Sequence, residues 1–343
     1  MTSTARRRWS RELEIEIDGI ALSRQGPVLV HGYEPPAGGM WIDEVIPGKL
    51  AALDRGTGET IWQSPCEVGY GRGFGAGFGE NGEVLVLGPS GSGHRIVRMN
   101  AETGELLGAE GIEAFDDAQV YEDVCICASA GQVIAVSTVM MSEAWRFRME
   151  GHRFHQVGRT GDRILVVHSN RKTQQKGVLA LDVVTGELVE QVIEPCLAEV
   201  HQMAVDGGHM ALLTADVAGL LTPELATTFL ADLARRENRY GDPVTDTLTL
   251  LGMTVGEEGA RAAWYEILST EAGQDLPDAS ITVDSGKLYD SSGAMVEVRD
   301  LLSGRALGDW TIPGLDEQVG WQVSEGAGLL AEENRISIFE LPA

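Results

Sequence analysis

The sequence predicts an all-β chain that folds as a seven-bladed β-propeller, with six or eight blades as alternatives. Three observations support this fold class. A strand-turn-strand motif recurs along the 343 residues, most of the chain divides into units of four short strands, and the last unit is one strand short. A motif that recurs along a chain indicates a repeat architecture, and a closed ring of sheets removes the exposed edges that such a chain would otherwise have.

The recurring motif is clearest in Gly48–Gln63, GKLAALDRGTGETIWQ, which is typical of a strand, a tight turn and a second strand. Glycine tolerates positive φ, and Asp and Thr side chains bond neighbouring backbone groups, so this composition favours a hairpin. The pattern returns in Arg95–Glu110, Val178–Gln191 and Met295–Trp310.

The two ends of the chain indicate how the propeller closes. The last unit has three strands, and Arg6–Leu13 has the composition of an outer strand with no unit before it. Trp9 then corresponds to tryptophans on the outer strands of other units, namely Trp62, Trp145, Trp264 and Trp310. We therefore expect residues 1–343 to form a single domain in which the N-terminal strand completes the last blade.

The fifth unit contains a helical insertion over 222–241, with the helix itself expected at Thr222–Arg239. Thr222 supplies a capping hydroxyl, Pro223 stands at the first helical position and Glu224 is an early acid. Apolar residues follow at helical spacing, namely Leu225, Phe229 and Leu233. This stripe is expected to face either the propeller or a partner. The later stretch Ala260–Leu268 fits a strand or a helix.

Composition restricts the classes of partner and the compartment. Lys and Arg total 26 against 52 Asp and Glu, which gives a formal charge of −26. Such a surface repels phosphate backbones and anionic lipid, so we expect no nucleic acid and no membrane partner. The four cysteines lack CxxC spacing, and neither a signal peptide nor a long apolar span is evident. A reducing cytoplasm is the expected location.

Two copies of the motif, ALDRGTGETIW (Ala52–Trp62) and ALDVVTGELVE (Ala180–Glu190), resemble the PQQ-like repeat of the quinoprotein-dehydrogenase-like β-propellers. The resemblance covers nearly the whole chain outside the insertion. In that family the turn closes a hairpin and the Trp packs between adjacent blades, so the shared residues imply fold rather than chemistry. The family includes enzymes that hold pyrroloquinoline quinone with calcium, and also scaffold proteins. This chain is much shorter than the enzymes and lacks their adjacent cysteine pair, so the resemblance implies a non-redox relative without the quinone.

Polar residues recur on the innermost strands, where propellers usually bind ligands. Four of these strands contain Gln in like positions, namely Gln119, Gln156, Gln202 and Gln322, and His155 and His201 precede two of them. Two imidazoles from successive strands could share a divalent metal, with Gln156, Gln202 or His168 completing the ligand set. The pattern resembles in kind the His/Gln set that holds manganese in seven-bladed pectate-type lyases. The alternative is that these side chains bond strand-end carbonyls or water.

Two functions follow. The first is a non-catalytic cytoplasmic scaffold that presents its loops and the insertion to another protein. The second is a metal-dependent enzyme of lyase or hydrolase type, or a binder of small ligands, that uses His155 and His201. No catalytic residue is assigned, because no Ser/His/Asp order or paired-carboxylate motif is evident, and the oligomeric state is left open. The glycine-rich Gly71–Gly79 is not followed by a helix, so it predicts a close-packed inner strand rather than a phosphate-binding loop.

Overall fold

The computed structural model describes residues 3–22, 26–34, 46–69, 73–91, 93–196, 199–215, 217, 220–236, 247–256, 259–269, 280–291, 295–315 and 320–341. The chain divides into two compact units. The terminal unit contains Thr4–Arg148 and Thr311–Ala343, and the middle unit contains Met1–Ser3 and Met149–Trp310. Strands form nearly all of the regular structure in both units.

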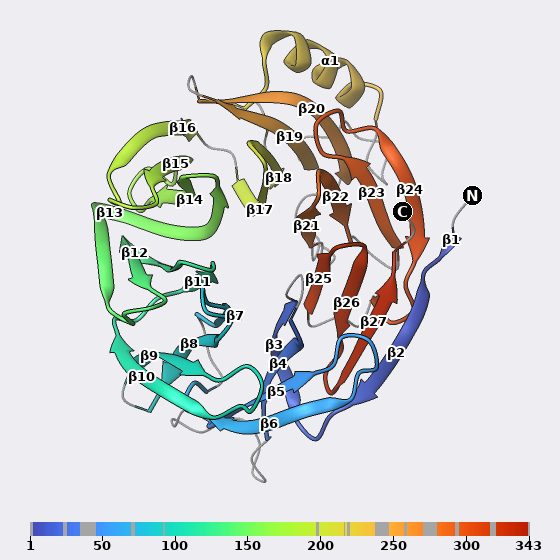
Figure 1. Cartoon of the computed structure of the whole chain (residues 1–343). Helices are drawn as coiled ribbons and strands as arrows, with labels where there is room; N and C mark the ends of the chain where they lie inside the picture. Colours follow the sequence, from blue (N-terminus) through green and yellow to red (C-terminus); the bar gives the residue numbers. More distant parts are fainter. Residues whose placement is uncertain are drawn as a thin grey trace. The chain divides into compact units, whose positions relative to one another are not determined.

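Three four-stranded antiparallel sheets lie in the terminal unit (Figure 1). The first consists of β3 (Glu16–Leu22), β4 (Val28–Tyr33), β5 (Gly48–Leu53) and β6 (Thr60–Cys66). The second consists of β7 (Gly75–Phe78), β8 (Val84–Ser90), β9 (Gly93–Met99) and β10 (Leu106–Ile112). A buried apolar cluster includes side chains of both sheets, among them Leu50, Trp62 and Val86.

The third sheet joins the two ends of the chain. Its order is β2-β27-β26-β25, formed by β2 (Arg6–Glu12), β25 (Gly320–Ser324), β26 (Ala327–Ala331) and β27 (Arg335–Glu340). Strand β2, blue in Figure 1, runs antiparallel to the red β27, from the pair Arg6 and Glu340 to the pair Glu12 and Arg335. This is the pairing that the sequence predicts for the N-terminal strand.

The prediction of seven blades is wrong, because the described strands form six sheets. One sheet has six strands, in the order β11 (Asp117–Val120), β12 (Val124–Ser137), β13 (Glu143–Thr160), β14 (Arg163–Asn170), β15 (Lys176–Asp182) and β16 (Leu188–Cys196). Strands β12 and β13 are 14 and 18 residues long, and each contains two of the predicted strands. The third and fourth predicted units are therefore one hydrogen-bonded sheet, and the chain passes from the terminal unit to the middle unit within β13.

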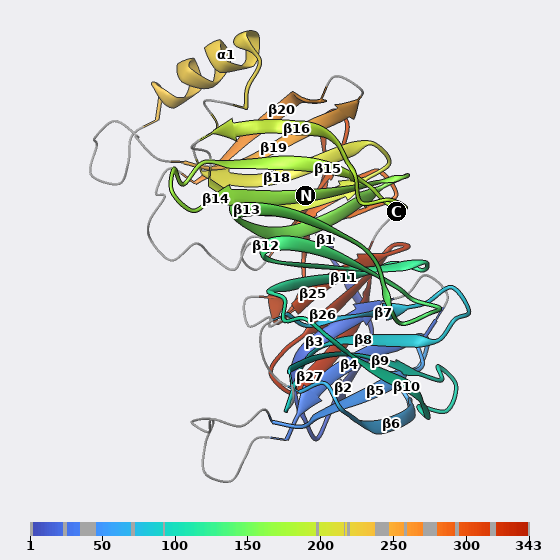
Figure 2. The ribbon, with the colours of Figure 1, turned by 90° about the vertical axis from the view of Figure 1, so that its left-hand side faces the viewer.

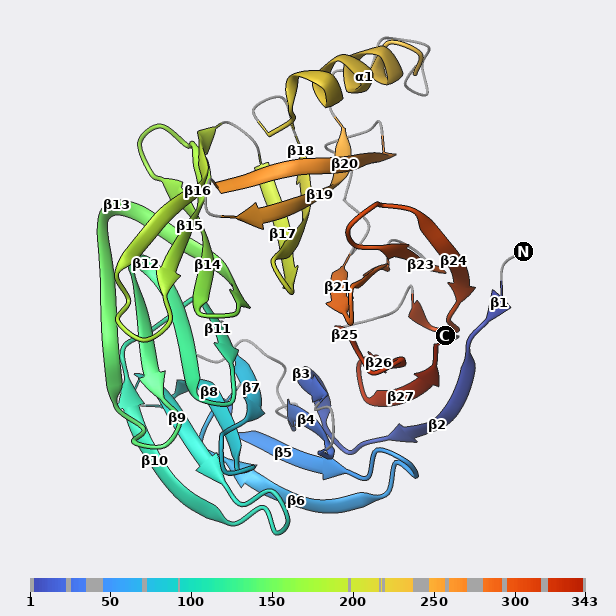
Figure 3. The same ribbon diagram turned by 45° about the horizontal axis from the view of Figure 1, so that its top comes forward.

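The middle unit contains two further sheets and the helix. One sheet consists of β17 (Glu199–Asp206), β18 (His209–Ala215), β19 (Leu248–Gly256) and β20 (Gly259–Ser269), which follow one another in Figure 3. The other consists of β21 (Ile281–Asp284), β22 (Lys287–Asp290), β23 (Met295–Asp300) and β24 (Ala306–Thr311), with the short β1 (Ser3–Thr4) at its edge. Strand β20 includes Ala260–Leu268, the stretch for which the sequence predicts either a strand or a helix.

Helix α1 (Pro223–Leu233) lies beside β20 (Figure 2). The Thr222 side chain accepts a hydrogen bond from the Leu225 backbone N–H at 3.4 Å, as predicted for the cap. Phe229 is buried and, with the partly buried Leu233, packs against Ile267 and Val217. The helix is shorter than predicted, since it ends at Leu233, and the predicted end of the insertion lies outside the described residues.

The recurring turn has one hydrogen-bond pattern. The Asp54 carboxylate accepts from the backbone N–H groups of Gly56 at 3.0 Å and Thr57 at 2.7 Å, and the Thr57 hydroxyl accepts from Glu59 N–H at 3.2 Å. Closely related bonds hold the turns that begin at Asn100, Asn170, Asp182 and Asp300. These bonds lower the pKa of the Asp54, Asp182 and Asp300 carboxyls, because they favour the charged form.

A tryptophan covers the glycine at the end of three of these turns. Gly58 has φ 70°, and a Cβ placed on it would lie 2.5 Å from the Trp9 ring. The Trp9 indole N–H also donates to the Arg55 carbonyl at 2.9 Å. Trp62 covers Gly104 and Trp264 covers Gly304 in the same way. The outer strand of one sheet is thereby fastened to the turn of the next sheet within each unit.

Candidate functional site

Three of the four predicted glutamines connect neighbouring inner strands. The Gln156 side-chain amide, on β13, donates to the His201 carbonyl on β17. Gln202, on β17, accepts from the Ile281 N–H on β21 at 2.7 Å. In the terminal unit, Gln322 accepts from Leu22 N–H and donates to the Ile20 carbonyl, both at 2.9 Å. These amides perform the backbone-bonding role that the sequence leaves open as the alternative to metal binding.

His155 and His201 lie on the strands that carry Gln156 and Gln202. The His155 Nε2 atom is 2.9 Å from the Ser169 hydroxyl, and the His201 backbone carbonyl accepts from Gln156. Gln156 occupies a bulge with φ 40°, and its side-chain oxygen is buried without a hydrogen-bond partner among the described residues. Across the described ranges, no group of three or more His, Cys, Asp or Glu is placed to hold a metal ion. The His/Gln metal site therefore stays a prediction.

A second cluster surrounds His168 on β14. Its ring lies 5.2 Å from the His152 ring, and its Nε2 atom is 3.1 Å from the Gln191 amide nitrogen. Its Nδ1 atom is buried and has no hydrogen-bond partner in the described part of the chain. Burial, together with the nearby His152 and His155, lowers the pKa of His168 to about 4. His168 is therefore a neutral side chain at pH 7.

The terminal unit contains a cluster that sequence reasoning missed. His31, on β4, is 1% exposed, and its Nδ1 atom lies 2.5 Å from an Asp18 carboxylate oxygen. Its Nε2 atom lies 3.0 Å from the Val68 carbonyl, and its ring stacks on Phe74 at 4.5 Å. Burial alone lowers the pKa of His31, but hydrogen bonds to Asp18 and Cys66 outweigh it and raise the pKa to about 10. His31 is therefore a buried cation at pH 7.

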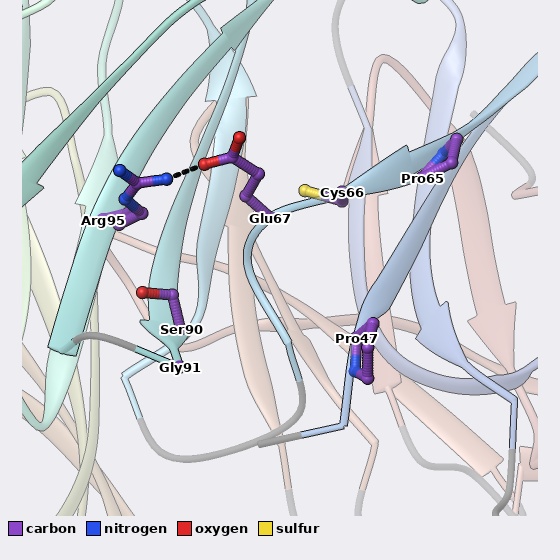
Figure 4. A pocket seen from close by; sticks show the side chains of 7 residues that line it. All are labelled: Pro47, Pro65, Cys66, Glu67, Ser90, Gly91 and Arg95. Atoms are coloured by element: carbon purple, nitrogen blue, oxygen red, sulfur yellow. Dashed lines mark ion pairs between the residues drawn. The ribbon is translucent and has the colours of Figure 1, made fainter. Parts of the chain in front are cut away.

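Cys66 of this cluster opens onto a cavity. The cavity has a volume of about 600 Å³ and is lined by Pro47, Pro65, Cys66, Glu67, Ser90, Gly91 and Arg95. Arg95 and Glu67 form an ion pair in its wall. In Figure 4 the Cys66 sulfur points toward the side of the cavity on which this pair lies. One signal in the sequence could have found the cluster: His31 interrupts the apolar run PVLVHGY, and a buried strand histidine needs a polar partner.

The terminal unit also exposes four large apolar side chains, called here the apolar patch: Leu106 and Leu107 of β10, and Val139 and Met140 of the turn between β12 and β13. All four side chains are exposed, and Met140 is 73% exposed. Arg98 of β9 connects this turn to β10. The Arg98 guanidinium donates to the Val139 carbonyl at 3.0 Å, and Arg98 is the register partner of Gly108, next to Leu107.

The remaining candidates have structural roles. In the glycine-rich segment, a Cβ on Gly75 or Gly77 would lie within 3.0 Å of atoms of Ala118 or Val120, so these glycines permit close packing of β7 on β11. The apolar stripe of α1 packs on the chain itself, since Phe229 contacts Tyr265 and the Tyr265 hydroxyl donates to Asp232 at 2.6 Å. Of the described helical residues, none belongs to a segment long and apolar enough to cross a membrane.

Comparisons with known proteins agree with this architecture. Residues 47–192 match the family model described as outer membrane protein assembly factor BamB. The crystal structure of BamB from Moraxella catarrhalis has a TM-score of 0.50 and 12% sequence identity, over 99% of this chain and 98% of that chain. The β-propeller domain of Cps50 (Swd1) from Myceliophteria thermophila has a TM-score of 0.59 and 11% identity, over 97% of this chain and 100% of that chain. A search of curated proteins gave no match. At these identities the likeness shows the β-propeller fold and nothing further.

Proposed function

The chain is a β-propeller whose residues 47–192 match a PQQ-like repeat family model, and we propose that it is a non-catalytic scaffold of that family that binds another protein through the apolar patch. The patch is the observation that carries the proposal. It exposes two leucines, a valine and a methionine on a strand and a turn that Arg98 connects, in a chain with a formal charge of −26. Contiguous exposed apolar groups surrounded by polar surface are typical of protein-binding sites.

Two observations favour a protein as the partner. The family model that matches residues 47–192 is described as an outer membrane protein assembly factor. The acidic surface disfavours nucleic acid and anionic lipid as alternatives. We place this role in the cytoplasm, on the sequence argument that the cysteines lack the spacing of a disulfide framework.

The sequence offers loop surfaces and the helical insertion as candidate contacts. The patch includes one such turn, whereas the apolar stripe of α1 faces its own unit, with Phe229 buried against Ile267. Leu230 is the exposed leucine of the helix. The turn and edge strand around Met140 and Leu107 therefore offer a better-formed contact surface than the helix does.

The test compares charges introduced at two exposed sites, the apolar patch and a turn of the middle unit. A Leu107→Asp, Met140→Asp double variant places two charges in the patch, and Val184→Asp places one in a turn of the middle unit where Val184 is 77% exposed. Wild-type and variant chains are immobilised, and proteins captured from the native host are quantified by mass spectrometry. We expect a specific partner to be retained by wild type and Val184→Asp and reduced at least about tenfold by the patch variant, since a buried charge in a contact costs several kcal/mol.

Thermal unfolding of all three chains provides the control. The substituted side chains are exposed, so the melting temperatures should agree within a few degrees. If the three chains capture every protein equally, the patch is not a protein-binding site.

A further inference from the structure

Gly48 creates a place for an imidazole beside Cys66. Gly48 on β5 is the register partner of Cys66 on β6, so their side-chain positions lie on the same face of the sheet. A Cβ on Gly48 would lie 2.4 Å from the His31 Nε2 atom. The His31 ring thus fills the space that a side chain at position 48 would occupy, next to the Cys66 thiol.

The partners of His31 fix its protonation. One ring nitrogen faces the Asp18 carboxylate at 2.5 Å and the other faces the Val68 carbonyl at 3.0 Å. Both partners are acceptors, so both nitrogens donate, which only the imidazolium form can do. The charged groups around the thiol are therefore Asp18 and His31 on β3 and β4, together with Glu67 and Arg95 at the cavity. The Cys66 sulfur therefore lies beside a positively charged ring.

Two further cysteines provide an internal contrast. Cys125 and Cys127 lie on β12, and both are buried among apolar side chains. Burial raises the pKa of Cys125 to about 12 and that of Cys127 well above its usual range. They have the surroundings of inert core thiols, whereas Cys66 has an imidazolium beside it and a cavity in front of it.

We propose that Cys66 is a nucleophilic thiol, positioned by His31 and Asp18, that small hydroperoxides oxidise to a sulfenic acid. The thiolate sulfur attacks one peroxide oxygen, so that an S–O bond forms and the O–O bond breaks. The sulfur is oxidised by two electrons and the peroxide is reduced. The departing oxygen takes a proton from solvent, and the sum is thiol plus hydroperoxide giving sulfenic acid plus water or alcohol.

The cavity restricts the size of the reactant. Cys66 is only 4% exposed, and its approach runs through a space of about 600 Å³. Hydrogen peroxide is small enough to reach a thiol of such low exposure. Arg95, at the wall, carries N–H donors and a positive charge that can stabilise the departing hydroxide.

The deciding experiment uses the wild-type chain. Native protein and protein unfolded in urea are treated with hydrogen peroxide in the presence of dimedone, and the adduct on each cysteine peptide is followed over time by mass spectrometry. We expect native Cys66 to react at least as fast as unfolded Cys66 in spite of its burial. Native Cys125 and Cys127 should react at least about a hundredfold more slowly than when unfolded, because their opening requires local unfolding. Native protection of Cys66 comparable to that of Cys125 would overturn the proposal.

The variant Asp18→Asn tests whether Asp18 holds the His31 ring in position beside Cys66. It removes the carboxylate that holds the imidazolium, and we expect the Cys66 rate to fall at least about tenfold while the chain remains folded. Slow reaction at Cys125 and Cys127 in the same sample reports that the variant is folded. An unchanged Cys66 rate in a folded variant would exclude the role of Asp18. If the variant unfolds, the comparison of native and unfolded wild-type chains tests the reactivity of Cys66 without it.

Discussion

His31 in the terminal unit and His168 in the middle unit are each 1% exposed, and each lies on a strand with a continuous apolar run. Their partners differ. His31 faces a carboxylate and a carbonyl, whereas His168 faces an amide nitrogen on one side and has no described partner on the other. The pKa of His31 is raised to about 10 and that of His168 is lowered to about 4.

The difference shows that burial does not by itself decide the charge of a histidine. Burial lowers both pKa values, but in His31 the hydrogen bonds to Asp18 and Cys66, together with the charge of Asp18, outweigh the desolvation. The neighbouring imidazoles of His168 add to its desolvation instead. One unit therefore contains a buried ion pair and the other a buried neutral ring. The two sites predict different effects of substitution and of pH on the free energy of unfolding.

Removing the carboxylate of the ion pair should have the largest effect. Asp18→Asn leaves His31 buried without its counter-charge, so we expect the free energy of unfolding at pH 7 to fall by about 3–5 kcal/mol. Urea unfolding followed by tryptophan fluorescence measures this change. Asp162→Asn, at an exposed aspartate, is the control and should change stability by less than about 0.5 kcal/mol. Equal losses in the two variants would show that the pair contributes nothing to stability.

The two histidines also predict opposite pH dependences. Native His31 keeps its proton up to about pH 10, whereas unfolded histidine releases it near 6.5. Its contribution is therefore complete below pH 6.5 and is lost as the pH rises toward 10. Native His168 takes up a proton only near pH 4, so its contribution is complete above pH 6.5 and declines as the pH falls toward 4. Each slope is at most about 1.4 kcal/mol per pH unit.

Unfolding free energies at several pH values between 5 and 9.5 test both slopes. Asp18→Asn should flatten the alkaline side and leave the acidic side unchanged. A wild-type stability that does not fall between pH 7 and 9.5 would contradict the charged state of His31.

The sequence predicts those features that local chemistry determines. The Asp54 turn, the Thr222 cap and the pairing of the Trp9 strand depend on residues close together in the chain or on a repeat that marks equivalent positions. The turn at Asn170 escaped prediction, because Gln174 with φ 61° stands where the other turns have glycine.

The rest depends on contacts that no local pattern specifies. The blade count was wrong because β12 and β13 each continue through two predicted strands. The glutamines were found as a pattern, but whether Gln202 bonds a metal or the Ile281 backbone depends on how neighbouring strands meet. Asp18, His31 and Cys66 come from three different strands, so only the sheet brings them together.

The smallest effect is expected at the uncharged histidine. His168→Met removes a buried Nδ1 atom that has no partner among the described residues, and it replaces the ring with an apolar side chain that adapts to irregular space. The Gln191 amide keeps its bonds to the carbonyls of Ile193 at 2.6 Å and Val178 at 3.2 Å. We therefore expect the free energy of unfolding at pH 7 to change by less than about 1 kcal/mol. The matched variant is His31→Met, which leaves the Asp18 carboxylate without its partner and should cost about 3–5 kcal/mol. Urea unfolding of both variants under the same conditions gives the comparison, and similar losses at the two positions would show that volume, not charge pairing, distinguishes these sites.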